Sequence, residues 1–187
     1  MRALQAVACC VLLLTADTAA AADDGGVAMA AVRGVTLAQA SKIVEAALSE
    51  ARQGKLRPMT VLVLDGGGDL VAFKREDHTG ISRYNIALAK AYGALVMNRP
   101  SRAIGEIAAA GGQLFVESLM ASTAGRVNPS PGGVLIRDAA GLIIGAVGSS
   151  GDESYNDEAI AIAGVKAAGL RPEPADPTRP ALPTPPR

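Results

Sequence analysis

The chain contains one histidine, His78, in the polar run Arg75-Glu76-Asp77-His78-Thr79-Gly80. An imidazole can transfer a proton near neutral pH or ligate haem iron, and the neighbouring Asp77 could orient its ring. A histidine in a polar loop is also commonly just solvated. Composition alone therefore leaves the acid–base, iron-ligand and solvated interpretations open.

Carboxylates gather near the start of the last predicted helix, where Asp157-Glu158 follows Asp152-Glu153. Acidic residues in a first turn interact favourably with the helix dipole and need no ligand. A sharper interpretation makes Asp157 and Glu158 iron ligands or an acid–base pair, in which Asp157 or Glu158 can be the acid partner of His78. Three cations, Lys90, Arg99 and Arg102, are candidates for binding a ligand carboxylate, although cations near helix ends are often surface charges.

Glycines and serines form two further candidate loops. Pro131-Gly132-Gly133 precedes a predicted strand, and Gly148-Ser149-Ser150-Gly151 joins a strand to a helix. Backbone N–H groups and hydroxyls there can face an anion, or the glycines simply supply turns with positive φ. Asp65-Gly66-Gly67-Gly68 lacks a following Lys-Ser/Thr and leads into a strand, which indicates a hairpin turn rather than a phosphate loop.

The elements that must position these residues follow from hydrophobic periodicity. A helix is predicted from Thr36, its N-cap, to about Gln53, where Gly54 ends it. Further along we predict a hairpin, a helix, one or two short helices broken near Gly111-Gly112, a second hairpin and a last helix, over residues 59–75, 81–98, 101–120, 134–148 and 154–168. The predicted fold is α/β (α+β), in the order α-β-β-α-α-β-β-α. Its antiparallel sheet has about five strands from two hairpins and is flanked by helices.

The two ends differ in composition from the middle. Residues 1–22 read as a signal peptide, with Arg2, the apolar run Ala6 to Leu14 and a small-residue cleavage site. We therefore expect a secreted or periplasmic protein, with residues 23–34 as a linker and 35–170 as the domain. Cys9 and Cys10 leave with the signal. Residues 171–187 form a Pro-rich tail, either a PxxP ligand or, as we favour, a solvated disordered segment.

Composition excludes several classes of function. Lys plus Arg and Asp plus Glu both number 18, and this zero net charge argues against a nucleic-acid binder. One histidine and two cysteines leave too few ligands for a structural zinc site. The apolar run of the signal is too short to span a bilayer, so we expect no stable membrane insertion after its cleavage.

Several segments in order resemble the GlcG/HbpS family of haem-binding or haem-degrading domains, over about residues 35–170. They are VLVLDGGGDLVAFKR (61–75), NIALAKA (85–91), NRPSRA (98–103), PGGV (131–134), IGAVG (144–148) with Gly151, and Asp157-Glu158. The resemblance implies a compact α/β domain that assembles into homo-oligomers, often tetramers or octamers. It also implies a haem or cobalamin-related ligand, proximity to glycolate or diol metabolism, or an accessory role to a redox sensor.

The family commonly shows a Gly-Ala pair where this chain has His78-Thr79, which makes His78 a stronger functional candidate. We expect an exported oligomer that binds haem or a related small ligand. Its candidate catalytic residues are His78, Asp77 and Glu158, and its candidate metal contacts are His78, Asp157 and Glu158. Its candidate ligand-binding residues are Arg75, Thr79, Lys90, Arg99, Pro131, Gly132, Gly133, Ser149 and Gly151.

Two other functions remain open at this stage. One is a cofactor-independent enzyme that performs proton transfer, a lyase reaction or hydrolysis on a small oxygenated acid. In that case His78 is the base, Asp157 or Glu158 is the acid, and the Ser149-Ser150-Gly151 backbone holds an anion. The other is an accessory protein whose Pro-rich tail docks a periplasmic dehydrogenase or sensor.

Overall fold

The computed structural model describes residues 34–177. The predicted signal peptide, nearly all of the predicted linker and the last ten residues of the predicted tail lie outside this range. Within it, no helix is both long and apolar enough to cross a membrane. The helical elements are α1 (Leu37–Gln53), α2 (Arg83–Met97), α3 (Ser101–Ile107), η1 (Ala108–Gly112), α4 (Gln113–Ser122) and α5 (Ser154–Ala167).

Helix α1 begins and ends where its sequence predicts. The Thr36 hydroxyl accepts a hydrogen bond from the Gln39 N–H at 3.2 Å, and the Gln39 side chain accepts one from the Thr36 N–H at 3.0 Å. This capping box satisfies two N–H groups that the first turn leaves without intrahelical partners. The helix ends at Gly54, and its buried face consists of Ala40, Ile43, Val44, Ala47 and Ala51.

The sheet has five antiparallel strands in the order β2-β1-β4-β3-β5. The two predicted hairpins supply β1 (Thr60–Asp65) with β2 (Leu70–Arg75), and β3 (Gly133–Arg137) with β4 (Ile143–Ser150). They join at the centre through pairing of β1 with β4. The predicted mixed fold with an antiparallel sheet is confirmed.

The fifth strand comes from a segment that the sequence assigns to the tail. Strand β5 (Arg171–Glu173) pairs with β3 at the edge of the sheet. Pro172 cannot donate a hydrogen bond, and an edge strand tolerates this because one of its sides has no partner. The folded chain therefore extends past the boundary predicted at residue 170.

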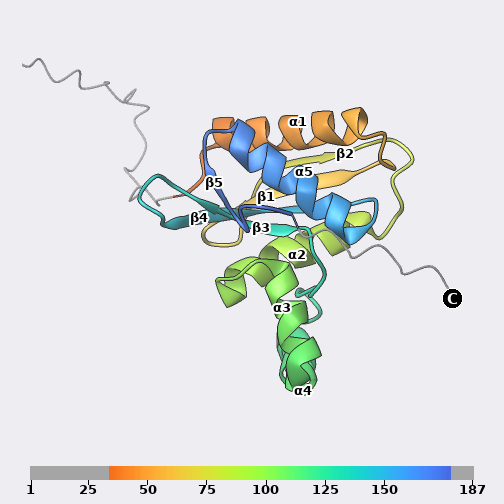
Figure 1. Ribbon diagram of the computed structural model, residues 1–187, viewed down its shortest axis with the longest axis vertical. Coiled ribbons are helices and arrows are strands. Elements are labelled where there is room, and N and C mark those ends of the chain that lie inside the picture. The colour runs from red at the N-terminus through yellow and green to blue at the C-terminus, as the bar shows by residue number, and fades with distance from the viewer. Residues whose placement is uncertain (1–33, 178–187) are drawn as a thin grey trace, which may run out of the picture. The chain divides into compact units, whose positions relative to one another are not determined.

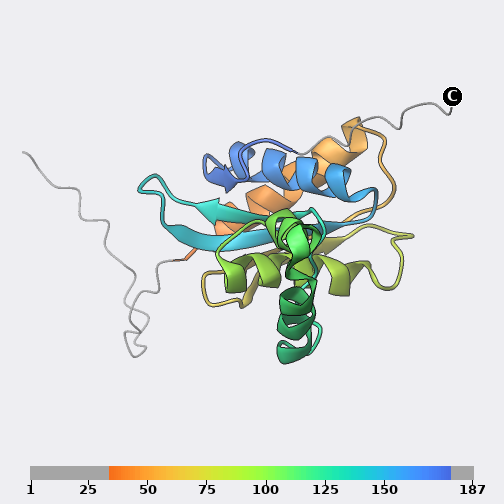
Figure 2. The same cartoon turned by 60° about the horizontal axis from the view of Figure 1, so that its bottom comes forward.

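Helices cover both faces of the sheet (Figure 1, Figure 2). Helices α1 and α5 pack on one face, around a core that includes Val61 and Val63 of β1. Helix α2 packs on the other face, where its alanines meet Leu62 and Leu64. The run from α3 to α4 bends at Gly111, which has φ 98°, as predicted from Gly111-Gly112. These layers place the first turn of α2 and the start of α5 close to the end of β4.

Glycines let α2 approach the sheet closely. A Cβ at Gly148 would collide with the Ala87 carbonyl oxygen, and one at Gly133 would lie 2.9 Å from the Ser101 Cβ and collide with the Lys90 carbonyl. Any larger residue at these two positions would push the helix away. The close approach holds Lys90 against the beginning of β3.

Candidate functional site

Most of the candidate residues converge at one end of the sheet, where β1 and β3 begin and β2 and β4 end. Register pairs Thr60 with both Arg75 and Ser150, and Gly133 with Gly148. Because the strands are antiparallel, residues that are far apart in sequence meet there. The helix α2 on one face and the first turn of α5 on the other add Lys90 and Asp157.

Lys90 and Asp157 form a buried ion pair that connects the two helical layers. The Lys90 Nζ lies 2.8 Å from Asp157 Oδ2, and the two side chains are 2 % and 1 % exposed. Lys90 also donates to the Ser149 carbonyl at 3.2 Å. Asp157 Oδ1 accepts the N–H groups of Gly151 at 3.1 Å and Asp152 at 3.0 Å. The carboxylate thus has a donor on each oxygen, as a buried charge requires.

Burial shifts the pKa of each partner in the direction that favours its uncharged form. Loss of solvation raises the pKa of Asp157 and lowers the pKa of Lys90, and the attraction between the charges offsets this only in part. Arg83, on the first turn of α2, further lowers the pKa of Lys90 by charge repulsion. The sequence indicated Lys90 only as a candidate for binding a ligand carboxylate. In the structure its ammonium binds a carboxylate of the chain itself.

The glycine and serine loops use their polar groups within the chain. The Gly133 N–H donates to the Ser101 hydroxyl at 2.8 Å, and the Gly151 N–H donates to Asp157. The Ser149 hydroxyl donates to the Asp157 carbonyl at 2.5 Å. Gly132, with φ 122°, follows the half-buried Pro131 in the chain and packs against the ion pair. These contacts indicate that the two loops are turns whose polar groups bond within the chain, rather than a site that holds an anion.

Glu158 lies fully buried beside Asp157 and forms an ion pair with Arg102. The distance from Arg102 Nη1 to Glu158 Oε2 is 3.0 Å, and the same nitrogen donates to the Asp176 carbonyl at 3.2 Å. Arg99 is exposed and lines a cavity of about 430 Å³ with Arg102, Glu106 and Glu173 among others. This cavity carries charges of both signs, so its chemistry does not select a ligand charge.

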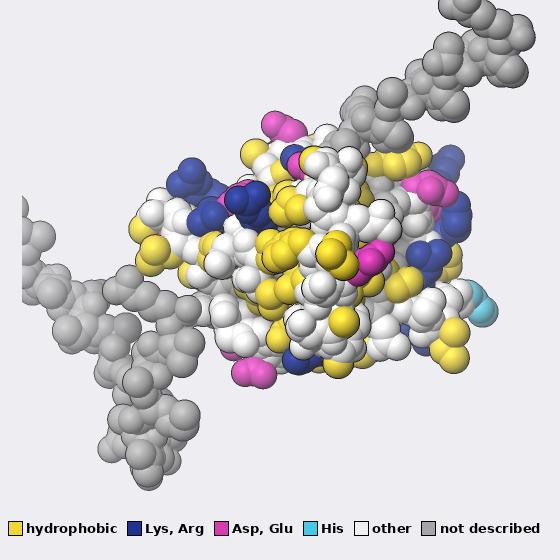
Figure 3. Space-filling view, turned by 90° about the horizontal axis from the view of Figure 1, so that it is seen from below, with side chains coloured by type: hydrophobic (Ala, Val, Ile, Leu, Met, Phe, Trp, Pro, Cys, Tyr) yellow, Lys and Arg dark blue, Asp and Glu magenta, His cyan; other side chains and the backbone are white. Residues whose placement is uncertain are grey.

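The loop after β2 presents His78 to solvent, and the histidine, cyan in Figure 3, lies at the surface. His78 has φ 65°, a conformation that costs a residue with a Cβ about 1–2 kcal/mol. Thr79 beside it is buried, and its hydroxyl donates to the Glu76 carbonyl at 2.6 Å. Arg75 donates to the Thr79 carbonyl. Asp77 is exposed.

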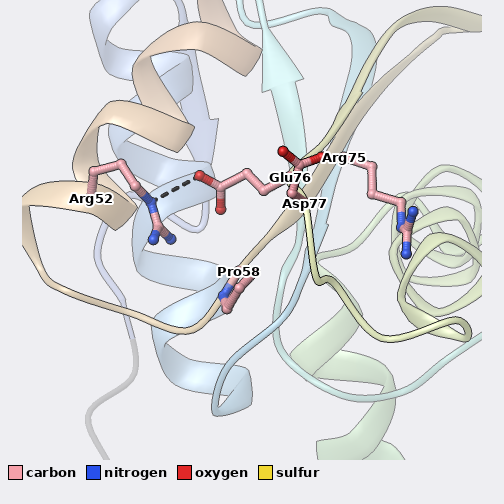
Figure 4. Close-up of a pocket in the computed structure, with 5 residues that line it drawn as sticks. All are labelled: Arg52, Pro58, Arg75, Glu76 and Asp77. Atoms are coloured by element: carbon pink, nitrogen blue, oxygen red, sulfur yellow. Dashed lines mark ion pairs between the residues drawn. The ribbon is translucent and has the colours of Figure 1, made fainter.

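A cavity of about 420 Å³ lies beside this loop and is lined by Arg52, Pro58, Arg75, Glu76 and Asp77 (Figure 4). Arg52 Nε lies 2.9 Å from Glu76 Oε1, so the charge of Arg52 is already compensated. The Arg75 side chain extends away from this pair, on the other side of the loop (Figure 4). The cavity therefore carries little net positive charge.

The candidate iron ligands do not form a cluster. Within residues 34–177 there is no group of three or more His, Cys, Asp or Glu side chains placed to hold a metal ion. Asp157 is bonded to Lys90, Glu158 is bonded to Arg102, and His78 lies on the exposed loop. An iron site built from Asp157 and Glu158 is not supported, because both carboxylates serve as internal counter-ions.

Sequence reasoning missed three polar residues of this end of the sheet: Thr60, Arg83 and Ser101. Ser101 binds the start of β3, Arg83 Nη1 reaches the Ser150 hydroxyl at 3.4 Å, and Thr60 opens the buried strand β1. Thr60 carried a signal, since it is a hydroxyl residue at the head of an apolar strand. Arg83 and Ser101 carried none, because their partners lie far away in the sequence.

The sequence matches the family described as haem degrading protein HbpS-like over residues 35–166, which covers more than half of the chain. The chain belongs to this HbpS-like family. No curated protein matches the sequence closely enough to count as a relative.

Solved structures share the fold of this HbpS-like domain. Klebsiella pneumoniae protein ORFY superposes with a TM-score of 0.67 at 25% identity, covering 75% of this chain and 94% of that one. HbpS superposes with a TM-score of 0.61 at 25% identity, covering 79% and 97%. PduOC, solved in complex with haem, superposes with a TM-score of 0.67 at 23% identity, covering 73% and 96%. The HbpS-like domain therefore corresponds to nearly the whole of each of these chains.

Proposed function

We propose that this protein is exported and binds haem at the loop that carries His78, as a homo-oligomer. Two comparisons support the ligand: the family is described as haem-degrading, and PduOC, of the same fold, was solved with haem. The observation on this chain that carries the proposal is the exposed His78 held at φ 65°. Non-glycine residues in this conformation are enriched at ligand-binding and active sites.

The residues around His78 fit a haem held at the surface. The imidazole is a common axial ligand of haem iron, and Arg75 next to it is an exposed cation suited to a propionate. Ile81, which is 96 % exposed, offers an apolar contact to a porphyrin face. Bound haem would supply redox-active iron. The chain's own residues bind and orient it through the imidazole, the guanidinium and this apolar side chain.

Exposed apolar side chains support an oligomer. Leu114 is 76 % exposed and Phe115 51 % exposed on α4, and hydrophobic side chains gather on that face (Figure 3). Apolar patches of this kind are typical of protein–protein contacts. Measurement of the molar mass in solution by light scattering tests this proposal, and a monomer at micromolar concentration contradicts it. Sequencing the N-terminus of the protein from its native host tests export, which an intact Met1 contradicts.

Haem binding is tested by adding haemin to the purified protein and recording the Soret band. We expect a shift for the wild type at micromolar concentration. His78→Asn is a matched variant, because asparagine tolerates the left-handed conformation but lacks the imidazole. It should fold normally and lose the Soret position of an imidazole-ligated haem. No shift in the wild type would contradict haem binding, and an unchanged spectrum in His78→Asn would exclude His78 as the ligand.

A further inference from the structure

Three polar residues are paired directly across neighbouring strands at one end of the sheet and form a row there: Arg75 on β2, Thr60 on β1 and Ser150 on β4. Alternate residues of a strand share a face, and directly paired residues of neighbouring strands do so too. Since Leu62 and Leu64 pack under α2, Thr60 and its two partners also face the α2 side. Phe73, two residues before Arg75, confirms this, because its ring meets Tyr84 of α2 edge-on at 5.2 Å.

A second arginine reaches this row from the first turn of α2. Arg83 Nη1 lies 3.4 Å from the Ser150 hydroxyl. In the part of the chain that the structure describes, no ion pair joins Arg75 or Arg83 to a carboxylate. A guanidinium has five N–H donors, and the bonds to Thr79 and Ser150 leave most of them available. One arginine with spare donors thus ends the row at β2, and a second one contacts the hydroxyl residue at its other end.

In the register Thr60 lies between Arg75 and Ser150, the hydroxyl residue that Arg83 reaches, and its side chain is fully buried. The Thr60 hydroxyl is a buried oxygen without a hydrogen-bond partner among residues 34–177. Buried hydroxyls are nearly always bonded, because leaving one without a partner costs free energy. An acceptor supplied from outside the chain would remove this cost.

We propose that Arg75, Arg83 and the hydroxyls of Thr60 and Ser150 form a binding site for a carboxylate group. Planar guanidinium groups match a carboxylate with paired N–H donors, and hydroxyls can donate to the same oxygens. The site lies on the α2 side of the sheet. It shares Arg75 with the cavity of Figure 4, but the Arg75 side chain extends away from the Arg52–Glu76 pair of that cavity, and Thr60, Ser150 and Arg83 are not among the residues that line it.

The carboxylate can come from a free small organic acid or from a haem propionate. The second source rests on the proposed function, and the first does not. Succinate is the probe for the free acid, with binding followed by calorimetry. Haemin and its dimethyl ester, in which both carboxylates are blocked, are the probes for the propionate, with binding followed by the Soret band.

Two variants test the site itself. Arg83→Gln should weaken carboxylate binding roughly tenfold or more, because it removes a charged hydrogen-bond donor. Thr60→Val keeps the shape and the strand preference but removes the hydroxyl. It should weaken carboxylate binding by roughly threefold to tenfold and raise the melting temperature of the ligand-free protein. Arg171→Gln changes an exposed arginine on β5 and should leave binding unchanged.

Each outcome decides between the proposals. Succinate binding that weakens in Arg83→Gln and Thr60→Val, but not in Arg171→Gln, supports a free acid even if haemin does not bind. Tighter binding of haemin than of its dimethyl ester, with the difference lost in Arg83→Gln, supports a propionate. If succinate does not bind and haemin and its ester bind equally, the carboxylate site is overturned while haem binding stands.

The carboxylate site is also overturned if Thr60→Val stabilises the protein without weakening the binding of any of these ligands. Ser150→Ala replaces Thr60→Val if that variant does not fold.

Discussion

The buried ion pair between α2 and α5 predicts a large and specific loss of stability in Lys90→Met. The substitution keeps the length and apolar stem of the side chain but removes the ammonium that lies 2.8 Å from Asp157. Asp157 then remains buried with only the N–H groups of Gly151 and Asp152 as donors. Leaving one charge of a buried pair uncompensated costs about 3–5 kcal/mol. That is a large fraction of the total stability of a domain, which is about 5–15 kcal/mol.

Urea unfolding at pH 7, followed by circular dichroism, measures this loss. Lys42→Met is the matched control, because Lys42 is exposed on α1 and its loss should change the free energy of unfolding by less than about 0.5 kcal/mol. The double variant Lys90→Met/Asp157→Asn removes the uncompensated charge. We expect it to be more stable than the sum of the single losses predicts, by about 1–3 kcal/mol.

Two results would refute the reasoning. One is a loss in Lys90→Met no larger than that in Lys42→Met, which would show that the ammonium is not compensating a buried charge. The other is simple additivity of the two single variants, which would show that the residues do not interact. If Lys90→Met does not fold, the stability of Asp157→Asn is compared with that of the double variant. The double variant should be at most about 1 kcal/mol less stable than Asp157→Asn.

Two further predictions concern the same end of the sheet. Because the pKa of Lys90 lies below 10.5 in the folded state, the unfolded chain binds more protons in the window between the two values. The free energy of unfolding should therefore increase as the pH rises through this window, by at most about 1.4 kcal/mol per pH unit. Urea titrations from pH 7 to 10 should show this increase in the wild type but not in Lys90→Met. A difference that shrinks as pH rises would contradict it. Gly132→Ala places a Cβ 2.9 Å from the Lys90 Nζ at φ 122°, whereas Gly141→Ala, at φ 85°, meets nothing within 4 Å. Thermal unfolding should show Gly132→Ala to be the less stable by about 1–3 kcal/mol, and equal losses would mean that only the backbone strain matters.

Much of the fold followed from local patterns. The cap at Thr36, the stop at Gly54, both hairpins and the break near Gly111 are decided by interactions among neighbouring residues, so the sequence shows them directly. Strand β5 was missed because three residues with a proline carry no strand pattern of their own. Pairing with the exposed edge of β3 makes them a strand.

The candidate site was predicted less well. The sequence singled out Lys90, Ser149, Gly132, Gly133, Gly151 and Asp157 as candidates, and the structure places them close together. Their roles differ from those expected, because Lys90 neutralises Asp157 and the glycines permit close packing. A sequence shows that a charge or a glycine is present, but not which group of the chain it meets.

By itself, the sequence of this protein determined the order of its elements, their caps and turns, its zero net charge and the presence of a single histidine. Only the tertiary structure decided that this histidine is exposed in a left-handed conformation, that Asp157 and Glu158 are internal counter-ions, and that Thr60 lies between Arg75 and Ser150. The physical reason is one of range. Helix and turn formation depend on residues a few positions apart. Burial, pKa and the partner of a charge depend instead on contacts between segments far apart in the sequence, such as Thr60 and Ser150, which are 90 positions apart.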